Sequence, residues 1–528
     1  MAGEREILRS ASVVGANTLL SRILGYVRDR VIAYLLGTSL FADAFYALFR
    51  LPNTFRRLMG EGALTAAVVP VFTEVREREG EEAGWTLAAR LFFVVGAVLA
   101  VVTLAGVVFS AQLLSVTGFA ERHADVVLDD AVLLNRIIFP YLFFICLAAL
   151  AMALLNSVGV FGPSAFTPVL LNLSIIAAAL VFGRRMEEPV RALAWGVLAG
   201  GILQLSFQIP FLWRRGFRLR ARGKILSRRV LEVAWLFVPA AFGAGITQIN
   251  ILVGTLVATY LDPGSVSSLY YADRVMELTY GVYALGIATV ILPAMSRFAA
   301  RGELERVKET LVFALRATFF IMIPSAAGLI LLRGPIIETL FLGGSYDARS
   351  VEMTAFALLF YALGLAGYAA VKVVVAVFYA EKDTKTPVRA AFAAFAANVL
   401  LMAWLVGPLS HGGIALATSC AAYLNAGLLF AVFLKRRGRV ALGELGASLA
   451  RTLAATAVMG AVVWFVAEKI SLHETAALGE KALRLGVVIA VGAAVYFLAA
   501  ALLGAREIGE LRSVFRRKLP ESSRGAHE

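Results

Sequence analysis

The chain has 528 residues, of which 60% are hydrophobic and only 16% are charged. A soluble domain carries about 25% charged residues, so this composition excludes a single water-soluble core. Lysine and arginine number 50 against 36 aspartates and glutamates, which gives a formal net charge of +14. In a membrane protein such an excess points first to cytoplasmic loops and not to nucleic acid.

Apolar blocks of about 20 residues, the length that crosses a bilayer as a helix, follow one another along the chain. Fourteen such blocks are bounded by charges or by glycine and proline, at about 9–36, 40–73, 85–115, 126–157, 162–183, 190–213, 231–260, 267–296, 307–332, 350–379, 386–407, 411–434, 445–468 and 480–503. The sequence therefore predicts an all-α polytopic membrane protein with about fourteen transmembrane helices.

The loop cations predict the orientation of these helices. With an even number of passes both termini lie on one side, and five basic segments fall on that side: 214–229, 297–308, 382–389, 435–439 and 506–518. The turns on the other side are nearly neutral, apart from the arginines near 184–191. Because cytoplasmic loops are rich in lysine and arginine, we expect both termini in the cytoplasm.

Four short motifs recur along the chain at nearly one spacing, between 219 and 227 positions. They are Arg90 with Phe92-Phe93 and Arg316 with Phe319-Phe320, Thr167-Pro168-Val169 and Thr386-Pro387-Val388, Arg214-Arg215-Gly216 and Arg436-Arg437-Gly438, and Pro70 and Pro293. Their common order indicates duplication of a six-helix unit, and two copies of an even unit insert the same way up.

The duplication predicts two parallel six-helix lobes around a central cationic cavity. The N-lobe takes residues 1–222 and the C-lobe residues 223–440. Two additional helices occupy residues 441–505, and a cytoplasmic tail follows at 506–528. This is the plan of a two-lobed transporter.

The first apolar block contains four charged residues: Arg22, Arg28, Asp29 and Arg30. A charge at the centre of a membrane helix costs about 2.5–3.5 kcal/mol, whereas a leucine returns only about 0.3–0.6 kcal/mol. This helix therefore cannot face lipid all round. Arg22 and Asp29 are seven positions apart and lie near one face of an unbroken helix, and a break at Gly25 would let both arginines turn into a cavity.

Three further blocks contain charges. We expect Pro52 and the glycines of 60–62 to bend the second block. The charged or polar site candidates are Asp43, Asn53, Arg56 and Glu61 in the second block, Asp273, Arg274 and Glu277 in the eighth, and Lys372 in the tenth. Arginine outnumbers carboxylate here, so the predicted cavity is electropositive. Guanidinium groups match phosphate, and an amphiphilic anion also needs a lateral groove, which the last two helices could supply.

Several of these segments resemble the MurJ (MviN) family of lipid II flippases, in the MOP exporter superfamily. The matching motifs are SRILGYVRD at 21–29, DAF at 43–45, LPNTFRR at 51–57, EGA at 61–63, YYADRVME at 270–277, Lys372 with Phe378-Tyr379, and KTPV at 385–388. The match covers nearly the whole chain and is most specific in the first two blocks.

The resemblance implies a transporter and not an enzyme, in the bacterial cytoplasmic membrane, that moves undecaprenyl-pyrophosphate-linked peptidoglycan precursor to the periplasmic leaflet for cell-wall synthesis. It implies that Arg22, Arg28, Arg56 and Arg274 bind the pyrophosphate and headgroup. It also implies supporting roles for Asp43, Glu61 and Glu277, and a groove for the lipid tail formed partly by the last two helices. Lipid II and membrane lipid are the expected partners, and cell-wall synthases remain open as protein partners.

Some relatives have a sodium site in helices 7, 11 and 12, where this chain offers Asn250, Asn398 and Thr418. Helices 11 and 12 contain no carboxylate, and oxygen-rich cation sites usually include one, so we predict neither a metal nor a cofactor.

Three alternatives stay open from the residues alone. A polysaccharide-lipid exporter or a MATE-type antiporter shares the superfamily, although a cationic drug would need an acidic cavity. An intramembrane lipid phosphatase or glycosyltransferase would need a histidine or paired-acid site, and the four histidines are scattered. A scaffold for cell-wall enzymes would leave the membrane arginines unexplained.

Overall fold

The structure is a computed structural model that describes residues 2–59, 63–115, 125–220, 223–470 and 477–510. Throughout these residues the regular structure is α-helical, with a single isolated bridge between Gly343 and Tyr346. The all-α prediction is therefore confirmed. By their contacts the helices form two units, Met1–Ser268 with Phe341–Ser350, and Leu269–Leu340 with Val351–Glu528.

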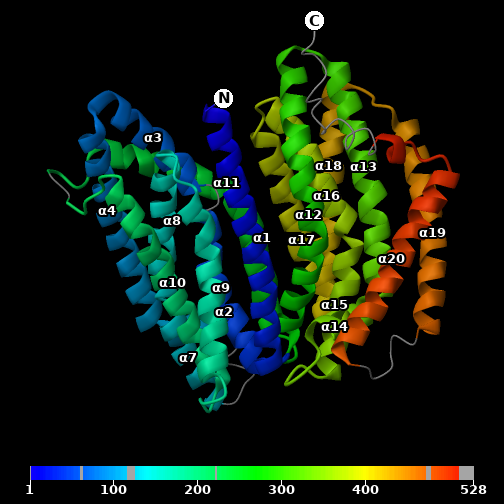
Figure 1. Cartoon of the computed structure of the whole chain (residues 1–528), viewed down its shortest axis with the longest axis horizontal. Coiled ribbons are helices and arrows are strands. Elements are labelled where there is room, and N and C mark those ends of the chain that lie inside the picture. The colour runs from blue at the N-terminus through cyan, green and yellow to red at the C-terminus, as the bar shows by residue number, and fades with distance from the viewer. Residues whose placement is uncertain (1, 60–62, 116–124, 221–222, 471–476, 511–528) are drawn as a thin grey trace, which may run out of the picture. The chain divides into compact units, whose positions relative to one another are not determined.

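The first unit contains the helices from α1 to α11. In chain order they are α1 (Ala2–Leu36), α2 (Leu40–Leu58), α3 (Leu64–Glu79), α4 (Glu81–Val108), α5 (Ser110–Ser115), α7 (Asp125–Ile138), α8 (Tyr141–Ser157), α9 (Gly162–Phe182), α10 (Pro189–Arg214) and α11 (Arg228–Thr259) (Figure 1). α9 packs between α1 and α10, and α11 packs on α2, α3 and α4.

The second unit contains the remaining helices. They are α12 (Ser265–Ala300), whose first turn belongs to the first unit, α13 (Leu304–Leu331), α14 (Arg333–Phe341), α15 (Ala348–Leu363), α16 (Leu365–Ala380), α17 (Lys385–Leu409), α18 (His411–Arg437), α19 (Leu442–Lys469) and α20 (Leu478–Leu502). α19 packs on both α13 and α20.

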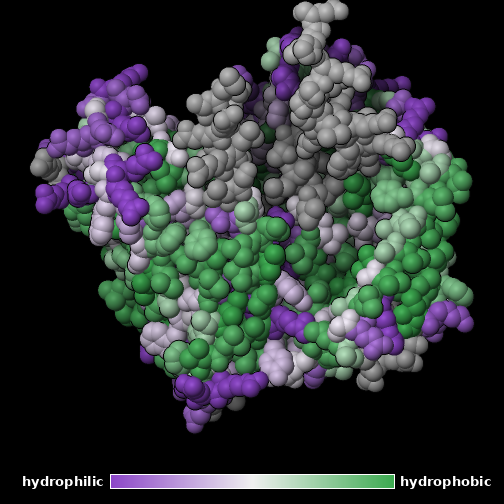
Figure 2. Space-filling view, in the orientation of Figure 1, coloured by the Kyte–Doolittle hydropathy of each residue, from purple (hydrophilic) through white to green (hydrophobic). Residues whose placement is uncertain are grey.

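Ten stretches within the described residues are long and apolar enough to cross a membrane. They are α4, α7 with α8, α9, α10, α13, α15 with α16, α17, α18, α19 and α20. Within each unit, hydrophobic side chains cover the middle of the helices and hydrophilic ones gather at their ends (Figure 2). The chain is thus a polytopic helical membrane protein, as predicted.

Helices of the two sequence halves match in length and position. α4 and α13 each have 28 residues, and they begin at Glu81 and Leu304. One transmembrane stretch of each half is interrupted, between α7 and α8 and between α15 and α16. The helices α10 and α18 are each followed by a glycine with positive φ, Gly216 at +97° and Gly438 at +81°. These matches agree with the spacing of the recurring motifs.

α1 is a continuous helix from Ala2 to Leu36, so the chain does not break at Gly25. A glycine inside a helix costs only about 1 kcal/mol, and α1 continues through Gly25 where it packs on α9; a Cβ on Gly25 would lie 3.7 Å from Asn172 Nδ2, an ordinary contact distance. α2 continues through Pro52 and ends at Leu58. The bend predicted at 60–62 falls on residues outside the described part of the chain.

A short segment from the second half of the sequence packs in the first unit. We call this segment, Phe341–Ser350, the strap. Ser345 N donates to Tyr34 O at 2.9 Å, and the hydroxyls of Thr38 and Ser350 are hydrogen-bonded at 2.8 Å. Gly344, at φ +59°, is required here because a Cβ would lie 2.3 Å from Tyr34 O. The strap is therefore fitted closely to the end of α1.

Candidate functional site

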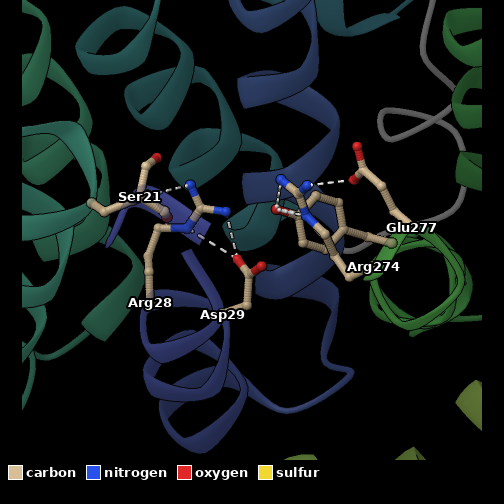
Figure 3. A network of polar contacts seen from close by, with 7 residues as sticks. Ser21, Arg28, Asp29, Arg274 and Glu277 are labelled. Carbon is tan, nitrogen blue, oxygen red and sulfur yellow. Dashed lines mark hydrogen bonds and ion pairs between the residues drawn. The ribbon is translucent and has the colours of Figure 1, made fainter. Parts of the chain in front are cut away.

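Arg28 is buried inside the first unit with three hydrogen-bond contacts. Its side chain donates to Asp29 Oδ1 from Nε at 3.0 Å and from Nη2 at 2.6 Å, and to Asn172 Oδ1 from Nη1 at 3.1 Å (Figure 3). Asn172 Nδ2 in turn donates to Ser21 O at 3.0 Å. Arg28 is 6% exposed and Asp29 is 3% exposed. The carboxylate compensates the buried guanidinium charge, which would otherwise be too costly to bury.

Arg56 is another predicted arginine of the first unit, and it is half-buried on α2. Its Nε donates to Asn53 Oδ1 at 2.9 Å, one helical turn earlier. The fully buried Tyr141 of α8 lies within electrostatic reach of both Arg56 and Arg28. The structure therefore brings Arg28, Arg56 and Asn53 to the same part of the first unit.

Arg22 lies on the same helix as Arg28 but differs from it in environment. Its side chain is exposed, as are its neighbours Ile23 and Leu19, whereas Arg28 and Asp29 are buried. An exposed guanidinium near the middle of an apolar helix is costly in lipid and favourable in water. We therefore expect Arg22 to face a water-filled space.

Arg274 is held by its neighbours on α12 in the second unit. Its Nη1 donates to Glu277 Oε2 at 2.7 Å, and Nε and Nη2 both donate to the Tyr270 hydroxyl at 3.1 Å (Figure 3). The guanidinium carbon lies 5.1 Å from the centre of the Tyr270 ring. These contacts fix the direction of the guanidinium group without burying it, since about a third of its side chain stays exposed.

The Asp43 carboxylate on α2 binds groups at the start of α12. Its carboxylate accepts hydrogen bonds from Gly264 N at 2.7 Å, Ser267 N at 2.8 Å and the Ser267 hydroxyl at 2.6 Å. Free N–H groups at a helix start attract a carboxylate. Asp43 therefore binds the start of α12 to α2.

Two more of the predicted site residues lie on α12 and α16. Asp273 is half-buried beside Arg274, and Lys372 is exposed on α16. Glu61 lies outside the described residues. The hydroxyl of Thr418, one of the sodium candidates, donates to Ile414 O at 2.8 Å inside its own helix.

Sequence reasoning missed Asn172 and Tyr270, the partners that orient Arg28 and Arg274. Asn172 is a polar side chain in the apolar stretch 162–183, and such a residue in a membrane helix is itself a signal of a polar contact. Tyr270 is one turn before Arg274 on one face of a helix, a spacing at which side chains meet.

Known proteins of one family match this chain over most of its length. The family described as "Lipid II flippase MurJ" matches residues 32–479. A probable lipid II flippase MurJ of Vibrio cholerae serotype O1 is 37% identical over 95% of this chain and 97% of the relative. A lipid II flippase MurJ of Burkholderia cenocepacia is 35% identical over 82% of this chain and 84% of the relative.

Solved structures show the same likeness. A lipid II flippase MurJ in an inward closed conformation has a TM-score of 0.78 and 25% identity, and covers 93% of this chain and 98% of its own. A MATE family transporter in an inward-facing conformation has a TM-score of 0.69 at 16% identity, covering 81% of this chain and 98% of its own, which shows a common fold alone. The match of the family over most of the sequence, together with these relatives, shows that the chain belongs to the MurJ family.

Proposed function

We propose that this chain flips lipid II, the undecaprenyl-pyrophosphate-linked peptidoglycan precursor, from the cytoplasmic to the periplasmic leaflet. The observation that carries the proposal is the buried Arg28, held by Asp29 and Asn172 inside a helical membrane protein of the MurJ family. A guanidinium group offers paired donors that match a pyrophosphate. The activity is transport, and no bond of the substrate is made or broken.

The finer arrangement is part of the same proposal. Fourteen passes result if α1, α11 and α12 each cross the membrane and α2 with α3 forms a single pass. The N-lobe of residues 1–222 and the C-lobe of 223–440 then surround one cationic cavity. The pairs that Arg28 makes with Asp29 and Arg274 with Glu277 limit the cost of these charges when no substrate is bound.

We further propose alternating access, with the termini in the cytoplasm. The strap and the Gly264–Ser267 segment come from the second half of the sequence and bind the ends of α1 and α2. With this orientation both contacts lie on the periplasmic side and break when that side opens. Export of an anion from a negative interior is downhill by about 2.3 kcal/mol per charge per 100 mV, so the membrane potential could drive the cycle.

A precursor delivered to the outer leaflet must be polymerised there. We therefore include cell-wall synthases as proposed protein partners of this chain.

A reconstituted flipping assay tests the function. Vesicles containing the wild-type protein and labelled lipid II should show transfer between leaflets, and Arg22→Ala or Arg274→Ala should abolish it while the protein stays folded. Arg301→Ala is a matched control, because Arg301 is an exposed loop arginine with a 3.9 Å contact to Glu303. Normal flipping by both cavity variants would contradict the proposal.

A binding experiment separates lipid II recognition from general lipid binding. Purified protein should bind labelled lipid II and fail to bind a phosphate-free isoprenoid of the same length. Equal binding of the two would show that the arginines do not recognise the pyrophosphate.

A further inference from the structure

A buried ion pair joins three helical segments at one end of the second unit. Arg316 of α13 is 6% exposed, and Glu507, in the segment after α20, is 2% exposed. Arg316 donates to Glu507 Oε1 from Nε at 2.8 Å, and its Nη2 lies 2.7 Å from the same oxygen. The hydroxyl of Ser448 on α19 also donates to this oxygen, at 2.7 Å. A single carboxylate thus links α13, α19 and the chain beyond α20.

The chain turns back after α20 to make this contact. α20 ends at Leu502, and Ala505 N donates to Ala500 O at 2.9 Å. Gly504 has φ +69°, a left-handed conformation that favours glycine. Burial raises the pKa of Glu507, but hydrogen bonds from Ser448 and Arg316 outweigh it, and the pKa lies below its usual value. Glu507 therefore stays charged beside Arg316.

The helices α19 and α20 are also attached to the second unit by the ion pair between Lys481 of α20 and Glu338 of α14, and Glu444 of α19 lies 3.9 Å from Arg316. Their outer faces are apolar and exposed, as at Leu453, Trp464 and Leu498. In a bilayer such helices gain little by packing on a neighbour, because lipid tails are equally apolar, and polar contacts weigh more. Besides the ion pair, α20 is attached to α13 by the Tyr496 hydroxyl, which donates to Phe320 O at 2.5 Å.

In the first half of the chain, Arg90 lies beside a loop that follows a membrane helix. Arg90 of α4 is the counterpart of Arg316 in the recurring motifs. Its Nη2 lies against the loop after α10, 3.2 Å from where a Cβ on Gly223 would be. Arg90 therefore lies beside the loop after α10, as Arg316 lies beside the segment after α20.

We propose that Arg316, Glu507 and Ser448 form a clamp that fixes the α19–α20 pair on α13, and that the clamp holds the groove for the isoprenoid tail in place during flipping. The inference rests on the proposed function and on the expectation that these two helices form part of the groove for the lipid tail. The three residues are positioning residues, since they hold helices and do not touch the headgroup.

A distance measurement tests the clamp directly. Spin labels at Glu309→Cys and Leu502→Cys, both exposed positions, report the spacing of α13 and α20 in a Cys420→Ser background. The wild-type pair should give one narrow distribution. Glu507→Gln should broaden it, and so should Arg316→Met/Glu507→Gln, which leaves neither charge of the pair buried and unpaired. Glu305→Gln on the exposed face of α13 is the control and should change nothing. An unchanged distribution in the folded double variant would overturn the clamp.

Flipping of two substrates then separates positioning from general damage. The double variant should flip full-length lipid II about tenfold more slowly than the wild type, the effect expected when a charged hydrogen bond is lost. A short-tailed analogue, which hardly occupies the groove, should change by less than about twofold. Equal losses for both substrates would overturn the clamp, whereas a wild-type protein that flips neither would refute the proposed function instead.

Discussion

A covalent link between α1 and the strap should stop transport. The hydroxyls of Thr38 and Ser350 are 2.8 Å apart and buried, although the residues are 312 positions apart in sequence. Two cysteines at these positions have the approach that a disulfide needs. Because periplasmic opening would separate the strap from α1, Thr38→Cys/Ser350→Cys should hold the protein closed on that side after oxidation.

The size of the effect follows from the length of chain that the link closes. Closing a loop of 312 residues lowers the entropy of the unfolded state by the equivalent of about 6 kcal/mol, so the oxidised protein should also unfold at a higher temperature than the reduced one. Flipping should fall to the level of empty vesicles, since the bond cannot open thermally. Reductant should return both the flipping rate and the unfolding temperature to the values of the reduced protein.

The assay uses the reconstituted protein in a Cys420→Ser background, because Cys420 is exposed and Cys146 is buried. Each single cysteine variant serves as a control and should flip lipid II at the same rate under oxidising and reducing conditions. Complete formation of the bond with unchanged flipping would refute the reasoning, since the strap would then play no part in opening.

Three further predictions follow from local contacts. Thr38→Val removes one hydrogen bond while Ser350 keeps its bond to Asp347 at 2.8 Å, so the open state should gain roughly two- to tenfold in population, measured by labelling of a cysteine at Ser345. Asn172→Leu takes a partner from Arg28 and should weaken lipid II binding about ten- to hundredfold, and unchanged affinity would count against its role. Hydrogen bonds from Thr386 and Arg436 hold the pKa of Asp383 well below its usual range. Its stabilising effect is therefore complete above the unfolded pKa of about 4 and is lost as pH falls further, so Asp383→Asn should lower the unfolding temperature at pH 7 and less so near pH 3.

The sequence by itself determined the class of protein and the positions of its charges. Composition and apolar blocks predict helices because hydropathy is a local property of about 20 residues. The recurring motifs predict matching helices, as α4 and α13 show. The charges of Arg28 and Arg274 stand out because each is costly in an apolar helix. The flexibility of Gly25 did not break α1, because this helix stays continuous where it packs on α9.

Only the tertiary structure decided which groups meet. Arg28 binds Asn172, 144 positions away, and Asp43 binds Ser267, 224 positions away. Arg316 binds Glu507 across 191 positions. Such pairs depend on the packing of helices that are distant in sequence, and no pattern within one helix specifies its neighbour. The sequence therefore marked Asp43 as a site residue, whereas packing made it the partner of the start of α12.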